Sequence, residues 1–171
     1  MEKLISRVTG FIVLLTFSIA ISVTLNAWAG ETEDHGRYVT EKGKYKAVKV
    51  GDVDGHVVGS FHDTGVFFGL GGDEKEISTS FGGGTFDFIN QVGPVRGFTV
   101  NVFKDGSTVT HQWEGEAKLD ENKKQYTEGT YQCTSGTGRW KGVQCKGTWK
   151  QSSEANGMSI GGWSGTLTLR D

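Results

Sequence analysis

A two-residue alternation of side-chain character runs through the middle of the chain. From Thr108 to Leu119 the odd positions are apolar or small, with one histidine, whereas the even positions are Thr, Gln, Glu or Lys. Successive side chains of a strand point to opposite faces, so this segment has one dry face and one wet face. Residues 95–103 alternate in the same way, and Lys104-Asp105-Gly106 supplies a turn between the two segments. The pattern predicts an antiparallel hairpin.

The rest of the chain reads as short strands broken by some of its 27 glycines, and no window shows a helical stripe. The sequence Gly-Thr followed by an aromatic residue or Leu recurs every 18 residues, at Gly129, Gly147 and Gly165. Many short strands in one domain leave two architectures open, a closed antiparallel barrel or a two-sheet sandwich. The further strands expected are 45–53, 56–61, 66–70, 77–81, 85–90 and 163–169.

The start of the chain predicts export. Lys3 and Arg7 precede an uncharged apolar run over 11–25, and Ala27-Trp28-Ala29 follows as a small-residue cleavage site. This order is typical of a secretory signal peptide, and the run is short for an uncleaved membrane anchor, which takes about 20 apolar residues. We therefore expect a signal peptide over 1–29, a flexible polar leader over 30–43 and a barrel domain over 44–171, in a secreted or periplasmic protein.

The composition and net charge limit the classes of partner that this chain could bind. The chain is 35% apolar and 22% charged, which argues against disorder, and its formal charge of −2 gives no electrostatic basis for binding nucleic acid or an anionic membrane. After signal cleavage we expect no membrane partner.

Two cysteines, Cys133 and Cys145, lie close together in the sequence. In an oxidising compartment they are most simply a disulfide that closes a short loop. Zinc would need two more ligands, and no histidine lies near either cysteine in the sequence, so we expect no metal.

A glycine-rich segment carries a family resemblance. Residues 127–150 include Thr127-Glu128-Gly129-Thr130-Tyr131, the turn Gly136-Thr137-Gly138-Arg139-Trp140-Lys141-Gly142, and Gly147-Thr148-Trp149. This arrangement resembles the allene oxide cyclase and dirigent-like barrel superfamily, whose members carry a Gly-x-Gly-x-aromatic-x-Gly turn between two late strands. The resemblance implies a ligand cavity inside an eight-stranded barrel, and a homo-oligomer, since the cyclases are often trimeric. We therefore expect an all-β fold: a single antiparallel eight-stranded, calycin-like β-barrel after a cleaved signal peptide.

One ionisable side chain falls on a dry strand face. Strand parity places His111 between Val109 and Trp113, where a partly buried imidazole can act as acid, base or ligand anchor. The alternative is a core histidine that is satisfied by the backbone. We name four residues as candidates for ligand binding: His111, Trp113, Tyr131 and Trp149.

Other patterns are weaker. Glu114 and Glu116 share a polar face, where burial would not raise either pKa. His56 and His62 would lie about 20 Å apart on one uninterrupted strand, too far to share an ion with Asp63. The segment 52–55 starts like a calcium loop but lacks the later ligands, so it is read as a hairpin turn.

No catalytic triad, phosphate loop or dinucleotide fingerprint is present in the sequence, so we assign no catalytic residue and expect no cofactor. The favoured function is binding of a small, largely apolar molecule in the barrel interior. The alternatives are a cyclase or isomerase of the allene oxide cyclase kind, and a filled barrel that serves as a structural or interaction module.

Overall fold

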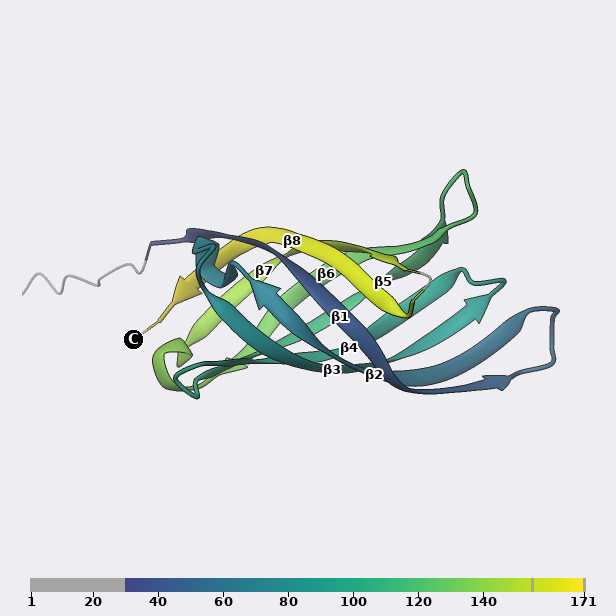
Figure 1. The fold of residues 1–171 in the computed structure, drawn as a ribbon, viewed down its shortest axis with the longest axis horizontal. Helices are drawn as coiled ribbons and strands as arrows, with labels where there is room; N and C mark the ends of the chain where they lie inside the picture. The colour runs from purple at the N-terminus through teal and green to yellow at the C-terminus, as the bar shows by residue number, and fades with distance from the viewer. Residues whose placement is uncertain (1–29, 155, 171) are drawn as a thin grey trace, which may run out of the picture.

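A computed structural model describes residues 30–154 and 156–170 and contains a closed antiparallel barrel (Figure 1). The barrel has eight strands, and each pairs with its neighbour in the sequence. The expected eight-stranded all-β fold is therefore confirmed. The strands are β1 (Thr32–Lys49), β2 (His56–Phe68), β3 (Ile77–Ile89), β4 (Gly93–Phe103), β5 (Thr108–Leu119), β6 (Gln125–Gly136), β7 (Val143–Ser153) and β8 (Met158–Leu169).

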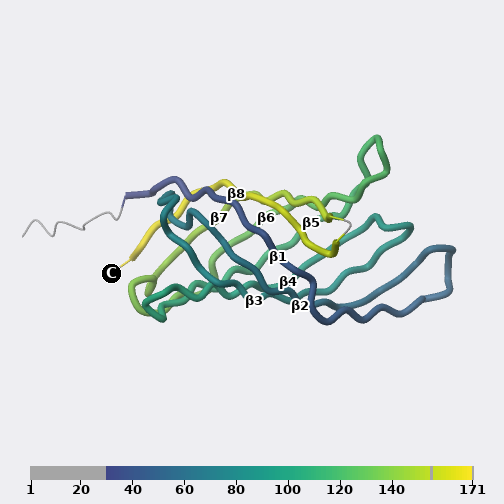
Figure 2. The backbone as a smooth tube through the Cα atoms, viewed as in Figure 1, coloured from purple at the N-terminus to yellow at the C-terminus, as the bar shows by residue number. Residues whose placement is uncertain are grey.

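β1 closes the barrel, and it corrects the leader expected over 30–43. The strand pairs with β2 on one side and with β8 on the other, so the barrel domain begins at Thr32 and not at residue 44 (Figure 2). The alternation is hidden in the sequence because two of the inward residues, Asp34 and Thr40, are themselves polar, although both are buried. Hydrophobic periodicity therefore gave no signal here.

β2 and β3 are each one strand where the sequence suggested two. β2 runs unbroken from His56 to Phe68, and β3 passes through the triple glycine at 82–84 without a turn. A run of glycines usually indicates a turn. Here each position pairs on both sides, and the missing side chains leave room for neighbours inside the barrel.

Aromatic rings occupy the space that glycines leave in the wall. A Cβ on Gly97 would lie 2.5 Å from Cζ2 of Trp113, and a Cβ on Gly147 would lie 2.7 Å from Cε1 of Tyr131. Gly147 pairs directly with Gly165, another member of the 18-residue repeat, whose own Cβ would come within 2.8 Å of the Tyr131 hydroxyl oxygen. Rings packed over glycines let a narrow barrel hold large aromatic side chains.

The two ends of the barrel differ. Short 3₁₀ turns, η1 (Leu70–Gly72) and η2 (Gly138–Trp140), lie at the end where the described chain begins, and Leu70 and Trp140 pack there into the buried core with Phe103. The long β1–β2 hairpin projects from the other end (Figure 1). Within the described ranges, no helix has the length and apolar character needed to cross a membrane.

Candidate functional site

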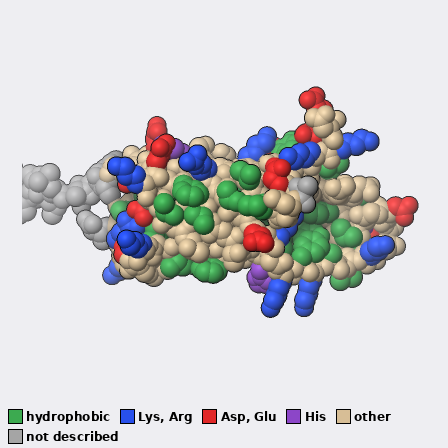
Figure 3. All heavy atoms as spheres, viewed as in Figure 1, with side chains coloured by type: hydrophobic (Ala, Val, Ile, Leu, Met, Phe, Trp, Pro, Cys, Tyr) green, Lys and Arg blue, Asp and Glu red, His purple; other side chains and the backbone are tan. Residues whose placement is uncertain are grey.

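The barrel interior contains a cavity of about 130 Å³. Buried His111, Tyr131 and Leu70 line its inner end, whereas exposed Lys42 and Tyr45 line its outer end, so the cavity opens toward the projecting hairpin. Hydrophobic side chains are visible at the base of that hairpin in the space-filling view (Figure 3). Ten aromatic residues line the cavity: Tyr38, Tyr45, Phe61, Phe67, Phe86, Phe88, Trp113, Tyr131, Trp149 and Trp163.

One row of paired strand positions carries four of the polar residues of the cavity wall, Lys42, Asp63, Thr99 and His111. Lys42 pairs with Asp63, Asp63 with Gly82, Gly82 with Thr99, and Thr99 with His111. Each member contributes from a different strand, β1 through β5. The register therefore places residues that lie far apart in the sequence along one row, which runs from Lys42 at the outer end of the cavity to His111 at its inner end.

All four residues predicted to bind a ligand line the cavity. Trp113 donates a 3.0 Å hydrogen bond from Nε1 to Oγ1 of Thr99, and its ring meets the Trp149 ring edge to face with centroids 5.8 Å apart. The His111 ring lies edge-on to Tyr131 at 5.9 Å. Their position suits contact with a ligand, and their role in binding stays a prediction.

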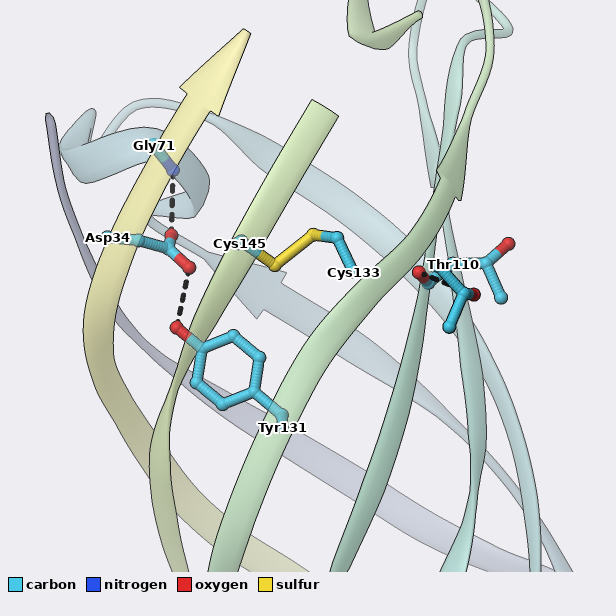
Figure 4. Close-up of a disulfide and its surroundings, with 7 residues drawn as sticks. Asp34, Gly71, Thr110, Tyr131, Cys133 and Cys145 are labelled. Atoms are coloured by element: carbon cyan, nitrogen blue, oxygen red, sulfur yellow. Dashed lines mark hydrogen bonds between the residues drawn. A yellow bond between two sulfur atoms is a disulfide. The ribbon is translucent and has the colours of Figure 1, made fainter. Parts of the chain in front are cut away.

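A buried polar network lies beneath the inner end of the cavity. Asp34 is fully buried, and its carboxylate accepts a 2.7 Å hydrogen bond from the Tyr131 hydroxyl and a 3.0 Å bond from the Gly71 amide (Figure 4). Burial, together with this bond to Asp34, raises the pKa of Tyr131, so the phenol stays protonated. Burial also lowers the pKa of His111 to about 4, against a smaller opposing effect of the Asp34 charge. His111 is therefore neutral at pH 7.

The predicted disulfide is present and lies beside this network (Figure 4). It joins Cys133 on β6 to Cys145 on β7, with Cα atoms 4.9 Å apart. Strand pairing places His111 opposite Cys133, a proximity that sequence distance concealed. The donor atoms of His111 and both cysteines lie within 4.8 Å of one another, but disulfide sulfurs are not the thiolates that bind metals. The arrangement therefore carries no metal assignment while the disulfide is formed.

Asp63 is a cavity residue that sequence reasoning did not select. It follows Phe61 on the inward face of β2, and the missing side chain of Gly82 leaves room for its carboxylate. Burial raises its pKa, and the nearby charges of His62 and Lys42 and two backbone hydrogen bonds offset only part of that effect. The signal that could have found it is the alternation of Phe61, Asp63 and Phe67 along one face.

The weaker sequence patterns fall outside the cavity. Glu114 and Glu116 are exposed on the outer face of β5, as the alternation predicted. β2 has no turn at Gly59, so His56 and His62 are not brought together.

His56 instead bridges two acids, an arrangement that sequence reasoning missed. Its Nδ1 lies 2.5 Å from Asp52 in the β1–β2 turn, and its Nε2 lies 2.8 Å from Asp87 on β3. This bridge ties the hairpin tip to the neighbouring strand.

The fold and cavity define a closed antiparallel barrel with an aromatic-lined interior that is open at one end. No protein-family model matches the chain, and no curated protein matches it. Among solved structures, the chain is similar to a pterocarpan synthase dirigent protein, with 15% identity and a TM-score of 0.49 over 91% of this chain and 99% of the other. A similarity of that size carries no argument about function.

Proposed function

We propose that this protein is an exported β-barrel that binds a small, largely apolar molecule in its interior. The observation that carries the proposal is the aromatic-lined cavity of about 130 Å³, which opens beside the β1–β2 hairpin. Apolar cavities of roughly 150 Å³ in protein cores take up molecules such as benzene. Burying apolar ligand surface contributes about 25 cal/mol per Å², so one enclosed ring would add several kcal/mol.

The dimensions limit the ligand. The enclosed part accommodates one ring or a short branched chain, and a larger molecule would extend to the outer end, where exposed Tyr45 stacks on Phe86 with centroids 5.2 Å apart. The flat walls formed by Trp113 and Trp149 favour a planar body.

Export is the second part of the proposal. The residues that would form the signal peptide, 1–29, lie outside the described part of the chain. The Cys133–Cys145 disulfide is compatible with an oxidising, extracytoplasmic compartment. N-terminal sequencing of the exported protein should begin at Gly30, and an intact Met1 would contradict cleavage.

Native mass spectrometry of protein purified from its own source tests the binding function. We expect a retained small molecule that is released on denaturation. Phe61→Leu, which alters the cavity wall, should weaken rebinding of that molecule, whereas Phe98→Leu on the exposed outer face should not. Protein that retains nothing and takes up no apolar probe would contradict the proposal and favour an interaction module.

A cyclase or isomerase is the second candidate, and Asp63 is the observation that favours it. Burial raises the pKa of this carboxyl, and a raised pKa makes a carboxyl better suited to proton transfer than an exposed one. A fitted cavity can also fold a reactive substrate with few catalytic groups. Recovery of the bound molecule in altered form after incubation would favour this candidate, and recovery unchanged would favour binding.

A further inference from the structure

We propose that the cavity selects organic cations: molecules with one apolar ring or short chain and a protonated amine that contacts the carboxylate of Asp63. This inference rests on the proposed binding function and names the class of ligand. It follows from the position of Asp63, from what surrounds its carboxylate and from the aromatic character of the walls.

Asp63 places a carboxylate inside the barrel. Among the residues that the structure describes, it is the one carboxylate that lines the cavity. It lies directly opposite Gly82 in the strand register, where any Cβ would collide with its Oδ1. A glycine at that position therefore keeps open the space that the carboxylate occupies. The barrel wall therefore has room for the Asp63 carboxylate, which still lines the cavity.

The protein supplies no close counter-ion for this acid. Within residues 30–154 and 156–170, no lysine, arginine or histidine nitrogen lies within 4.0 Å of its carboxylate. Lys42 on β1 is the strand-register neighbour of Asp63 on β2, but its side chain is exposed at the outer end of the cavity. His62 is also exposed and lies on the opposite face of β2. The raised pKa of Asp63 agrees with this incomplete compensation. A buried carboxylate is stabilised by a paired cation, and a ligand ammonium would supply one.

Aromatic faces surround the same space. Phe61, two residues before Asp63, stacks on Trp113 with ring centroids 6.0 Å apart, and Trp113 is anchored by its hydrogen bond to Thr99. The electron-rich faces of Trp, Tyr and Phe attract ammonium groups, most strongly where water is excluded. An aromatic enclosure with one carboxylate is the combination that a cation binds best, because the ring faces and the charge act together. A neutral ligand of the same shape would use the rings alone.

Calorimetric titration with three probes that share one ring tests the inference: 2-phenylethylamine, 2-phenylethanol and 3-phenylpropanoate. At neutral pH the amine is a cation, the alcohol is neutral and the propanoate is an anion. We expect the amine to bind roughly tenfold more tightly than the alcohol, from one charge-assisted hydrogen bond, and the propanoate to bind more weakly than either.

Variants assign the preference to Asp63. Asp63→Asn should abolish the preference for the amine over the alcohol. Glu114→Gln, on the outer face, should keep the wild-type preference. Lys42→Gln, which leaves Asp63 in place, should increase the affinity for the amine. Alcohol binding equal to amine binding would overturn the cation selection and leave the binding function standing. Absence of binding by all three probes would overturn both.

Discussion

The hydroxyl of Tyr131 on β6 donates a 2.7 Å hydrogen bond to Oδ2 of Asp34 on β1, and the two residues lie 97 positions apart in the sequence (Figure 4). The bond joins β1 to β6 beneath the cavity, although β7 and β8 separate the two strands in the barrel wall. A buried carboxylate depends on each of its donors, because water cannot replace them.

Tyr131→Phe should therefore destabilise the protein. Loss of the hydroxyl leaves the buried Asp34 carboxylate with the hydrogen bond from the Gly71 amide, at a cost of roughly 1–3 kcal/mol. Urea denaturation followed by circular dichroism measures the change. The matched control is Tyr126→Phe, since Tyr126 packs under the Lys150 ammonium on the outside, 4.4 Å from the ring centroid. Equal stability of the two variants would contradict the role of the buried bond.

His111 should make stability depend on pH. Burial lowers its pKa from 6.5 to about 4, so between these values the unfolded chain binds a proton that the folded protein does not. The contribution of His111 to the free energy of unfolding is therefore complete above pH 6.5. It declines by on the order of 3 kcal/mol as pH falls toward 4. The difference in unfolding free energy between wild type and His111→Gln, measured across this range, should shrink as pH falls. A parallel series on His35→Gln, an exposed histidine, controls for the substitution, and a constant difference for His111 would refute the prediction.

His56 should titrate in the opposite direction. Hydrogen bonds to Asp52 and Asp87 raise its pKa above 6.5, so its stabilising contribution is complete below pH 6.5 and is lost as pH rises through the raised value. Imidazole resonances followed by NMR should show a midpoint above 6.5. Asp87→Asn should move that midpoint down, and a midpoint at or below 6.5 in the wild type would exclude the bridge.

Reduction of the Cys133–Cys145 disulfide should lower stability. The two cysteines are 12 residues apart, and a closed loop of this size contributes roughly 3 kcal/mol. Urea midpoints with and without a thiol-free reductant measure the effect. The double variant Cys133→Ser, Cys145→Ser should have the urea midpoint of the reduced protein, and the reductant should not change that midpoint. Identical midpoints for oxidised and reduced wild type would be the contrary result.

Gly97→Ala should disturb the cavity wall. The new methyl carbon would lie 2.5 Å from Cζ2 of Trp113 and would collide with the Gly83 carbonyl, so the ring must move, at roughly 1–3 kcal/mol. Thermal unfolding and tryptophan fluorescence report the two effects. Gly30→Ala, where no atom lies within 4 Å, is the control and should be neutral. An unchanged fluorescence spectrum for Gly97→Ala would show that the ring does not depend on this glycine.

The locally encoded elements could be predicted from the sequence. The alternation over β5 gave its bounds, Thr108–Leu119, and the inward position of His111, because both depend only on the period of a strand. The Asp54-Gly55 and Lys104-Asp105-Gly106 turns were placed correctly, since glycine adopts the positive φ angles of 77° and 81° that they need. The disulfide followed from cysteine count and compartment.

The leader and the broken strands were wrong for one physical reason. A hydrophobic pattern reports burial only when the buried residues are apolar, and β1 buries Asp34 and Thr40 while β3 passes through glycines at 82–84. Their burial is set by partners on other strands, which no local window contains. Asp63 was considered only as a metal ligand with His56 and His62, because the cavity that it lines consists of side chains from all eight strands.

The β-strand character of this chain, the positions of several turns and the pairing of its two cysteines could be predicted from sequence, since each depends on residues near one another along the chain. The pairing of β1 with β8, the hydrogen bond from Tyr131 to Asp34 and the position of Asp63 among aromatic rings depend on the folded barrel. Closure of the barrel sets these contacts through a register shared by all eight strands, and register is a property of the whole sheet.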